Sequence, residues 1–164
     1  VVAITVGCGA QEPETTTYTN SVFGYSITLV DPFTAVEELN EQGLTTIGTS
    51  EGTAVQIVVL EREEPFGSDE LDASIERFNE VYAEKLPGGA EFKVMSTSDL
   101  KLGSGQTARI QLRSATIPGD CERHEYTLNV IHKGRLFHLM GMPCSDGSEI
   151  EVIKTIINSL SLSD

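Results

Sequence analysis

Positive charge, long apolar runs and proline are all scarce in this chain. Of its 164 residues, 11 are Lys or Arg and 25 are Asp or Glu, which gives a formal net charge of −14. A nucleic-acid-binding face needs Lys and Arg to neutralise phosphates, so this balance argues against that function class. No run of about 18 apolar residues occurs, so we expect no complete transmembrane helix. With 39% hydrophobic residues and six prolines, the composition is that of one folded domain.

Cysteine is scarce as well, and the first of the three cysteines follows an uncharged segment, residues 1–7. Val6-Gly7-Cys8 resembles a lipobox, although Thr5 stands where leucine is usual. We therefore interpret residues 1–8 as a truncated signal-peptide remnant with lipidation at Cys8. Residues 9–16 are then a flexible tether. The alternative is a short β-branched strand with an ordinary thiol.

If Cys8 carries lipid, Cys121 and Cys144 remain. Exported proteins occupy compartments where disulfides persist, and an even number of cysteines suits a single bridge. We expect these two to be joined, with a stabilisation of roughly 3 kcal/mol from chain entropy. The alternative is two unrelated buried thiols.

Apolar residues recur with the period of two that is typical of strands along most of the chain. A nearly continuous apolar run within residues 53–62 suggests a central strand covered on both faces. Residues 34–42 are mixed, and we expect a short helix or a loop there. The expected strands span residues 17–20, 24–30, 44–48, 53–62, 92–95, 100–102 and 107–114, followed by a hairpin over 122–142.

Two segments have helical spacing of apolar residues. Ser68 is the expected N-cap of a helix over 69–86, whose stripe would pack on the sheet. A second amphipathic helix is expected over 150–160. Two such helices and a mostly antiparallel central sheet predict an α+β fold, an α/β/α sandwich, over residues 17–164. The stripe of the first helix contains Leu71, Ile75, Phe78 and Tyr82.

All three histidines lie in the expected hairpin, which invites the hypothesis of a metal site. A turn at Lys133-Gly134 would pair Val130 with Phe137 and Leu128 with Leu139, which are sensible core pairs. In that register His124 and His132 share one face, about 26 Å apart along the strand, and His138 lies on the other. We therefore expect no metal site, and histidines that are exposed or at an edge.

Carboxylates are dense between residues 61 and 72. Their spacing matches no calcium loop, and a solvated loop before a helix explains them. Because exposed carboxylates can steer basic partner surfaces, we single out a candidate docking patch. The patch consists of Glu63, Glu64, Asp69 and Glu70.

Other patterns that could carry chemistry are weak. Gly103-Ser104-Gly105 joins strand to strand and offers no helix N-terminus for a phosphate, so we interpret it as a turn. No serine has the sequence context of a nucleophile elbow. We expect no catalytic residue, no cofactor and no metal.

The run from Tyr18 to Ile27, Y-T-N-S-V-F-G-Y-S-I, resembles the opening motif of the PsbP-like family. Pro32 follows where that family has a proline, with Phe33 in place of the usual tryptophan. The segment 105–110 and the closing helix at 150–160 continue the resemblance, which covers about residues 17–162. It implies the PsbP-like fold and a binding or assembly role. None of its motifs is catalytic.

Together these observations predict a lipid-anchored, extracytoplasmic module of the cell envelope that binds or assembles without catalysis. Its partner would be an unknown envelope protein, with membrane contact through the lipid alone and no nucleic acid. The alternative function is a small-molecule or ion carrier with a pocket between sheet and helix. We considered the region of Tyr18, Phe23 and Tyr25 as its lining. An enzyme is the third class, and it would require clustered titratable groups in a cleft.

Overall fold

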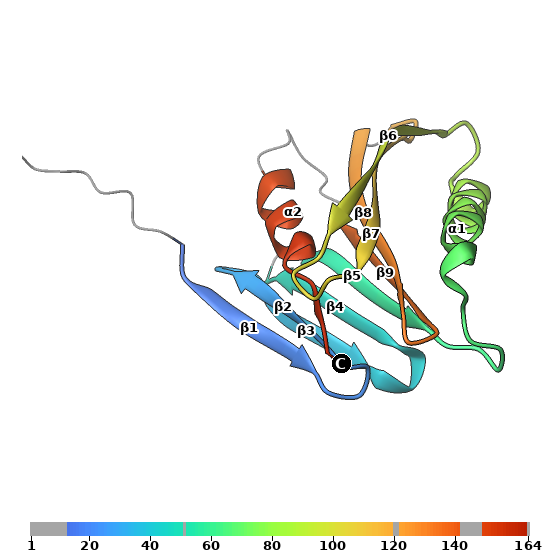
Figure 1. The fold of residues 1–164 in the computed structure, drawn as a ribbon. Coiled ribbons are helices and arrows are strands. Elements are labelled where there is room, and N and C mark those ends of the chain that lie inside the picture. Colours follow the sequence, from blue (N-terminus) through green and yellow to red (C-terminus); the bar gives the residue numbers. More distant parts are fainter. Residues whose placement is uncertain (1–12, 51, 120–121, 142–148, 164) are drawn as a thin grey trace, which may run out of the picture.

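The structure is a computed structural model that describes residues 13–50, 52–119, 122–141 and 149–163. Within these residues the chain forms ten strands and two α-helices (Figure 1). The helices are α1 (Leu71–Lys85) and α2 (Ile150–Asn158). The strands are β1 (Thr15–Asn20), β2 (Tyr25–Val30), β3 (Thr34–Leu39), β4 (Leu44–Thr49), β5 (Gly52–Leu60), β6 (Glu91–Lys101), β7 (Thr107–Thr116), β8 (Glu122–His132), β9 (Arg135–Gly141) and β10 (Ser161–Leu162).

Seven strands form one sheet in the order β3-β4-β5-β9-β8-β7-β6. The other three form a small sheet in the order β1-β2-β10, and the strand pairs of both sheets are antiparallel. The expected α+β class with mostly antiparallel strands and two main helices is confirmed. The expected single central sheet is replaced by two sheets. Strand β2 pairs with β1 and β10, and its Tyr25, Ile27 and Leu29 belong to the same apolar core as residues of the main sheet.

The β8–β9 hairpin has the register expected from the sequence. Val130 pairs with Phe137, and Leu128 pairs with Leu139. Lys133 and Gly134 form the turn with φ values of 50° and 73°, the left-handed region that a tight two-residue hairpin requires. A side chain at Gly134 would also meet Pro65, since a Cβ there would lie 2.5 Å from Pro65 Cβ. This turn therefore fixes which residues of the hairpin face each helix.

The two helices lie on opposite faces of the main sheet (Figure 1). Tyr82 of α1 bonds to Glu125, whereas Asn158 of α2 accepts a hydrogen bond from Tyr126 at 2.8 Å. Glu125 and Tyr126 are neighbours in β8, and successive side chains of a strand point to opposite faces. The sheet therefore has an α1 face and an α2 face.

The α2 face carries the apolar core. Ile153, Ile156 and Ile157 of α2 are fully buried against the strands. Gly141 admits this close approach, because a Cβ there would lie 2.1 Å from Ile153 Cγ2. The small sheet packs on the same core, where the Tyr25 and Phe137 rings meet edge to face at 6.0 Å.

The α1 face is much more polar. Ile75 is the only α1 residue that is fully buried, and the other members of the expected stripe are half-buried. Beneath the helix, many of the buried side chains of β7, β8 and β9 are polar. These are Gln111, Arg113, Glu125, Thr127, Asn129 and His138.

Several local expectations are corrected by the structure. Residues 34–39 form strand β3, where we expected a helix or a loop, and 91–101 form one strand instead of two. In both strands a bulge, between Ala35 and Glu37 and between Val94 and Ser96, breaks the period of two that the sequence pattern relies on. Ser68 begins a 3₁₀ turn ahead of α1 and does not cap it directly. Strand β10 was not expected.

No helix in the described part of the chain is long and apolar enough to cross a membrane.

Candidate functional site

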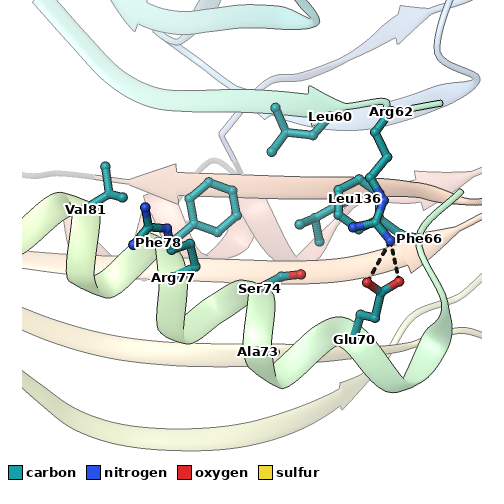
Figure 2. A pocket seen from close by; sticks show the side chains of 10 residues that line it. All are labelled: Leu60, Arg62, Phe66, Glu70, Ala73, Ser74, Arg77, Phe78, Val81 and Leu136. Carbon is teal, nitrogen blue, oxygen red and sulfur yellow. Dashed lines mark hydrogen bonds and ion pairs between the residues drawn. The ribbon is translucent and has the colours of Figure 1, made fainter. Parts of the chain in front are cut away.

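A groove of about 410 Å³ lies between α1 and the strands β5 and β9. Its apolar wall comes from Leu60 at the end of β5, Leu136 at the start of β9 and Phe78 on the helix. Figure 2 shows these side chains between helix and sheet, with Arg62 and Glu70 at one end and Arg77 near Phe78. Phe66, Ala73, Ser74 and Val81 complete the lining. We call this feature the α1 groove.

An ion pair stands at one end of the α1 groove. Arg62 Nη2 lies 2.7 and 2.5 Å from the two carboxylate oxygens of Glu70, and its guanidinium stacks 4.1 Å from the centre of the Phe66 ring. The hydrogen bond from Arg62 lowers the pKa of Glu70, as does the bond from the Gly67 backbone N–H. Both charged side chains are about 40% exposed, so the pair positions the loop before α1 more than it stabilises the fold.

A second ion pair lies wholly beneath α1. Arg113 on β7 and Glu125 on β8 are opposite each other in the ladder, 2.8 Å apart, with side chains 2% and 0% exposed. Tyr82 of α1 donates its hydroxyl to Glu125, and Arg113 donates to Asn79 Oδ1 at 2.9 Å. Burial and the bond to Glu125 raise the pKa of Tyr82 to about 12. Burial of Arg113 lowers the pKa of its guanidinium.

These contacts tie α1 to the sheet through polar groups. The helix thereby seals two charges from water, and charges in that position are costly unless they are paired. Arg113 Nε and Thr127 Oγ1 are buried and have no hydrogen-bond partner among the described residues. Hydrogen bonding of the buried polar groups beneath α1 is therefore incomplete.

His138 on β9 links the buried charges to the α1 groove. Its ring stacks on Phe78 with centroids 4.3 Å apart, and its Nδ1 lies 2.6 Å from Asn129 Oδ1. Asn129 faces His138 directly in the ladder. Burial, together with the smaller effect of the nearby Arg113 charge, lowers the pKa of His138 to about 3. The imidazole is therefore neutral at pH 7.

We expect this histidine to make the fold sensitive to acid. Its pKa in the native state lies below the unfolded value of about 6.5, so the unfolded chain binds the proton first as pH falls. The free energy of unfolding should then decrease between about pH 6.5 and pH 3, by up to about 1.4 kcal/mol per pH unit. His138→Gln should flatten this slope, which urea unfolding at a series of pH values measures. Parallel pH profiles for the two proteins would contradict the assignment.

The α1 groove is suited to binding. Its polar groups are two guanidinium groups, one carboxylate and the hydroxyl of Ser74, and none of the three histidines lines it. Among the described residues no three His, Cys, Asp or Glu side chains are placed to share a metal ion. The α1 groove therefore offers a ligand apolar contact along its length and charged side chains at its two ends (Figure 2).

The residues of the candidate docking patch do not form one uniform group. Glu63, Glu64 and Asp69 are exposed, whereas Glu70 is half-buried and bound to Arg62. Two neighbours in the same acidic stretch also have partners, because Glu61 pairs with Arg135 and Asp72 pairs with Arg109. The free carboxylates of the patch are thus confined to the loop before α1, next to the groove.

The three histidines differ in their surroundings. The opposite faces expected for His132 and His138 follow from the confirmed register. The expectation that all three are exposed or at an edge is wrong for His138, which α1 buries. His132 lies 3.1 Å from Gln106 Nε2 and 3.0 Å from the Ser163 carbonyl oxygen.

Other positions singled out in the sequence have structural roles or are not described. Tyr25 and Phe23 are buried in the core, and Tyr25 donates to Thr45 Oγ1 at 2.8 Å. Residues 102–106 form the expected turn, with Gly105 N–H bonded to the Leu102 carbonyl. The lipidation residue Cys8 and the expected disulfide partners Cys121 and Cys144 lie outside the described residues.

Sequence reasoning considered a pocket between sheet and helix but placed it near Tyr18, Phe23 and Tyr25, so it missed the residues of the α1 groove. It also missed the buried ion pair. One signal for the pair was present, since Glu125, Thr127 and Asn129 alternate with Tyr126, Leu128 and Val130. A polar face of this kind normally meets water, and only the position of α1 makes it buried. The groove left no signal, because Leu60 and Leu136 meet only through the pairing of β5 with β9.

No family profile and no curated protein matches the sequence. Among solved structures, cyanobacterial PsbP (CyanoP) from Synechocystis sp. PCC 6803 matches with a TM-score of 0.67 at 14% sequence identity, over 98% of this chain and 98% of that chain. This chain has a PsbP-like fold. A crystal structure from Bacteroides thetaiotaomicron matches with a TM-score of 0.60 at 12% identity, over 94% of this chain. This chain spans 50% of that second protein's length.

The PsbP-like fold indicated by the motif at residues 18–27 is thus confirmed. At such low identities the likeness concerns the fold alone, and no site residue is carried over from the neighbours. The function of this PsbP-like domain has to be argued from its own surfaces.

Proposed function

We propose that the protein is a binding module of the cell envelope that acts by association and not by catalysis, with the α1 groove as its contact site. The α1 groove itself carries this proposal, because its lining is largely apolar and lies between a helix and a sheet. Ligand sites are typically concave and mostly apolar, with a few polar groups that fix orientation. The PsbP-like fold supports a binding or assembly role by analogy only.

Two kinds of occupant fit such a module. A protein partner with a basic surface would be steered by the free carboxylates Glu63, Glu64 and Asp69 beside the α1 groove. A small molecule would occupy the groove itself, and the space between α1 and the sheet favours this carrier function as the second candidate.

The experiment that tests the contact site compares two tryptophan substitutions on α1. Ala73 lines the α1 groove, whereas Ala83 is exposed on the same helix and does not line it. Native mass spectrometry of protein purified from its own membranes should show a bound species in the wild type and in Ala83→Trp. Ala73→Trp fills the groove and should lose that species. Equal retention in all three proteins would contradict the proposed site.

We further propose that the module is anchored by lipid at Cys8 on the outer side of a membrane. The tether is then the segment between Cys8 and β1, because Thr15 and Thr16, which the sequence assigned to the tether, pair with Val30 and Leu29 of β2. The support is the match of Val6-Gly7-Cys8 to a lipobox, followed by a polar tract. The Cys121–Cys144 disulfide belongs to the same proposal, because that compartment allows disulfides to persist.

Cys8→Ser should move the protein from the membrane fraction to the soluble fraction. A single acyl chain already contributes about 0.8 kcal/mol per buried CH₂ group, and the formal charge of −14 would repel anionic headgroups without it. Fractionation of cells that express either protein, followed by immunoblotting, measures the shift. Unchanged membrane retention of the serine variant would contradict lipid anchoring.

A further inference from the structure

We propose that the α1 groove binds an amphipathic anion, with its apolar body against Leu60, Leu136 and Phe78 and its charged end at Arg77. This inference rests on the small-molecule form of the proposed function, and it names the chemical class of the ligand. The first argument is charge. The groove lining holds two arginines and one glutamate, in a chain whose formal net charge is −14.

Among the lining residues there is thus one more positive than negative charge. Charges farther apart than about 8 Å are largely screened at physiological salt, so Glu80, which is bound to Arg77, is the acidic group that an anion has to displace. The one carboxylate of the lining, on Glu70, already has both oxygens bonded to Arg62. One positive charge in the lining thus remains without a close partner from within the groove.

Arg77 supplies that charge. Its ion-pair partner is Glu80 at 3.2 Å, one turn along the helix, and the two side chains are 71% and 63% exposed. Such a pair contributes little and can exchange for another anion at small cost. Arg62, in contrast, forms an ion pair with both carboxylate oxygens of Glu70, and its guanidinium stacks on Phe66.

The positions of these groups give the ligand an orientation. Figure 2 shows Arg77 beside Phe78, with Leu60 and Leu136 between this end and the Arg62–Glu70 pair. An apolar chain lying along the groove would cover Leu60 and Phe78, above the buried Leu136, while its anionic end reached the guanidinium of Arg77. A guanidinium binds a carboxylate through paired hydrogen bonds, so a carboxylate is the end group that suits it best.

The test uses decanoate, decylammonium and decanol as probes that share one chain and differ in charge. Titration calorimetry, with each probe below its micelle-forming concentration, should show one decanoate bound per protein, with weaker binding of decanol and of decylammonium. Arg77→Gln should weaken decanoate binding about tenfold, because a charge-assisted hydrogen bond is lost. The matched control, Lys85→Gln, removes one positive charge from the same helix outside the groove and should leave the affinity unchanged.

Ala73→Trp should abolish the binding of decanoate. The inference is overturned if decylammonium binds as tightly as decanoate, if the Arg77 and Lys85 variants behave alike, or if no probe binds. If decanol or decylammonium binds equally well and Ala73→Trp blocks it, the groove is a binding site without anion selectivity. That result would agree with the proposed binding function and contradict only the inference that the ligand is an anion.

Discussion

Replacing Glu125 with leucine is expected to lower the free energy of unfolding by about 3–5 kcal/mol. The substitution leaves the guanidinium of Arg113 buried, 2% exposed, without the carboxylate that compensates its charge. It also removes the acceptor of the Tyr82 hydroxyl, so one contact that holds α1 to the sheet is lost. The effect should exceed that of any exposed ion pair in the protein, because water cannot replace the missing partner.

The matched control is the double variant Arg113→Met with Glu125→Leu. Removing both charges abolishes the desolvation cost of the pair, so most of the lost stability should return. Urea unfolding followed by circular dichroism measures all three proteins. A single variant within about 1 kcal/mol of the wild type would mean that water reaches Arg113 and that α1 does not seal the pair.

Phe137→Ala is expected to cost about 3–5 kcal/mol. Phe137 is fully buried on the α2 face of β9, where its ring contacts Tyr25 from the small sheet. Truncation removes buried apolar surface and leaves a cavity between the two sheets and α2. The rigid surroundings of α2 and β2 limit how far the core can collapse into that cavity.

Phe78→Ala is the matched comparison, because it removes the same side chain from the α1 face. Phe78 is half-buried, stacks on His138 and lines the α1 groove. Its loss should cost less than half as much as the loss of Phe137. The sequence indicated Phe78 as a core residue of the first helix. If both variants lose the same free energy of unfolding, Phe78 is a core residue after all and the contrast between the two faces is wrong.

The sequence predicted well wherever one face of an element meets apolar core. The register of β8 and β9 followed from the turn at Lys133-Gly134 and from the pairs that it implies. The apolar stripe of α2 predicted a buried helix face, and its Ile153, Ile156 and Ile157 are indeed fully buried. In these elements local periodicity and tertiary packing favour the same arrangement.

The sequence-based predictions failed where the structure depends on contacts between elements that are far apart in the chain. Bulges in β3 and β6 interrupt the alternation, so their patterns resemble a loop and two short strands. The polar alternation at Glu125 and Asn129 resembles a solvent face until α1 covers it. The α1 groove depends on where the helix lies over β5 and β9, and neither strand nor helix alone contains that information.

The central claim, that this domain binds through its α1 face, is tested most directly by hydrogen–deuterium exchange. Protein purified from its own membranes is compared before and after its bound species is removed. We expect binding to slow exchange in α1 around residues 73–81 and at the adjoining end of β9, with α2 and β10 unchanged. Slowed exchange confined to α2, or to the edge strands β3 and β6, would place the contact elsewhere and contradict the claim.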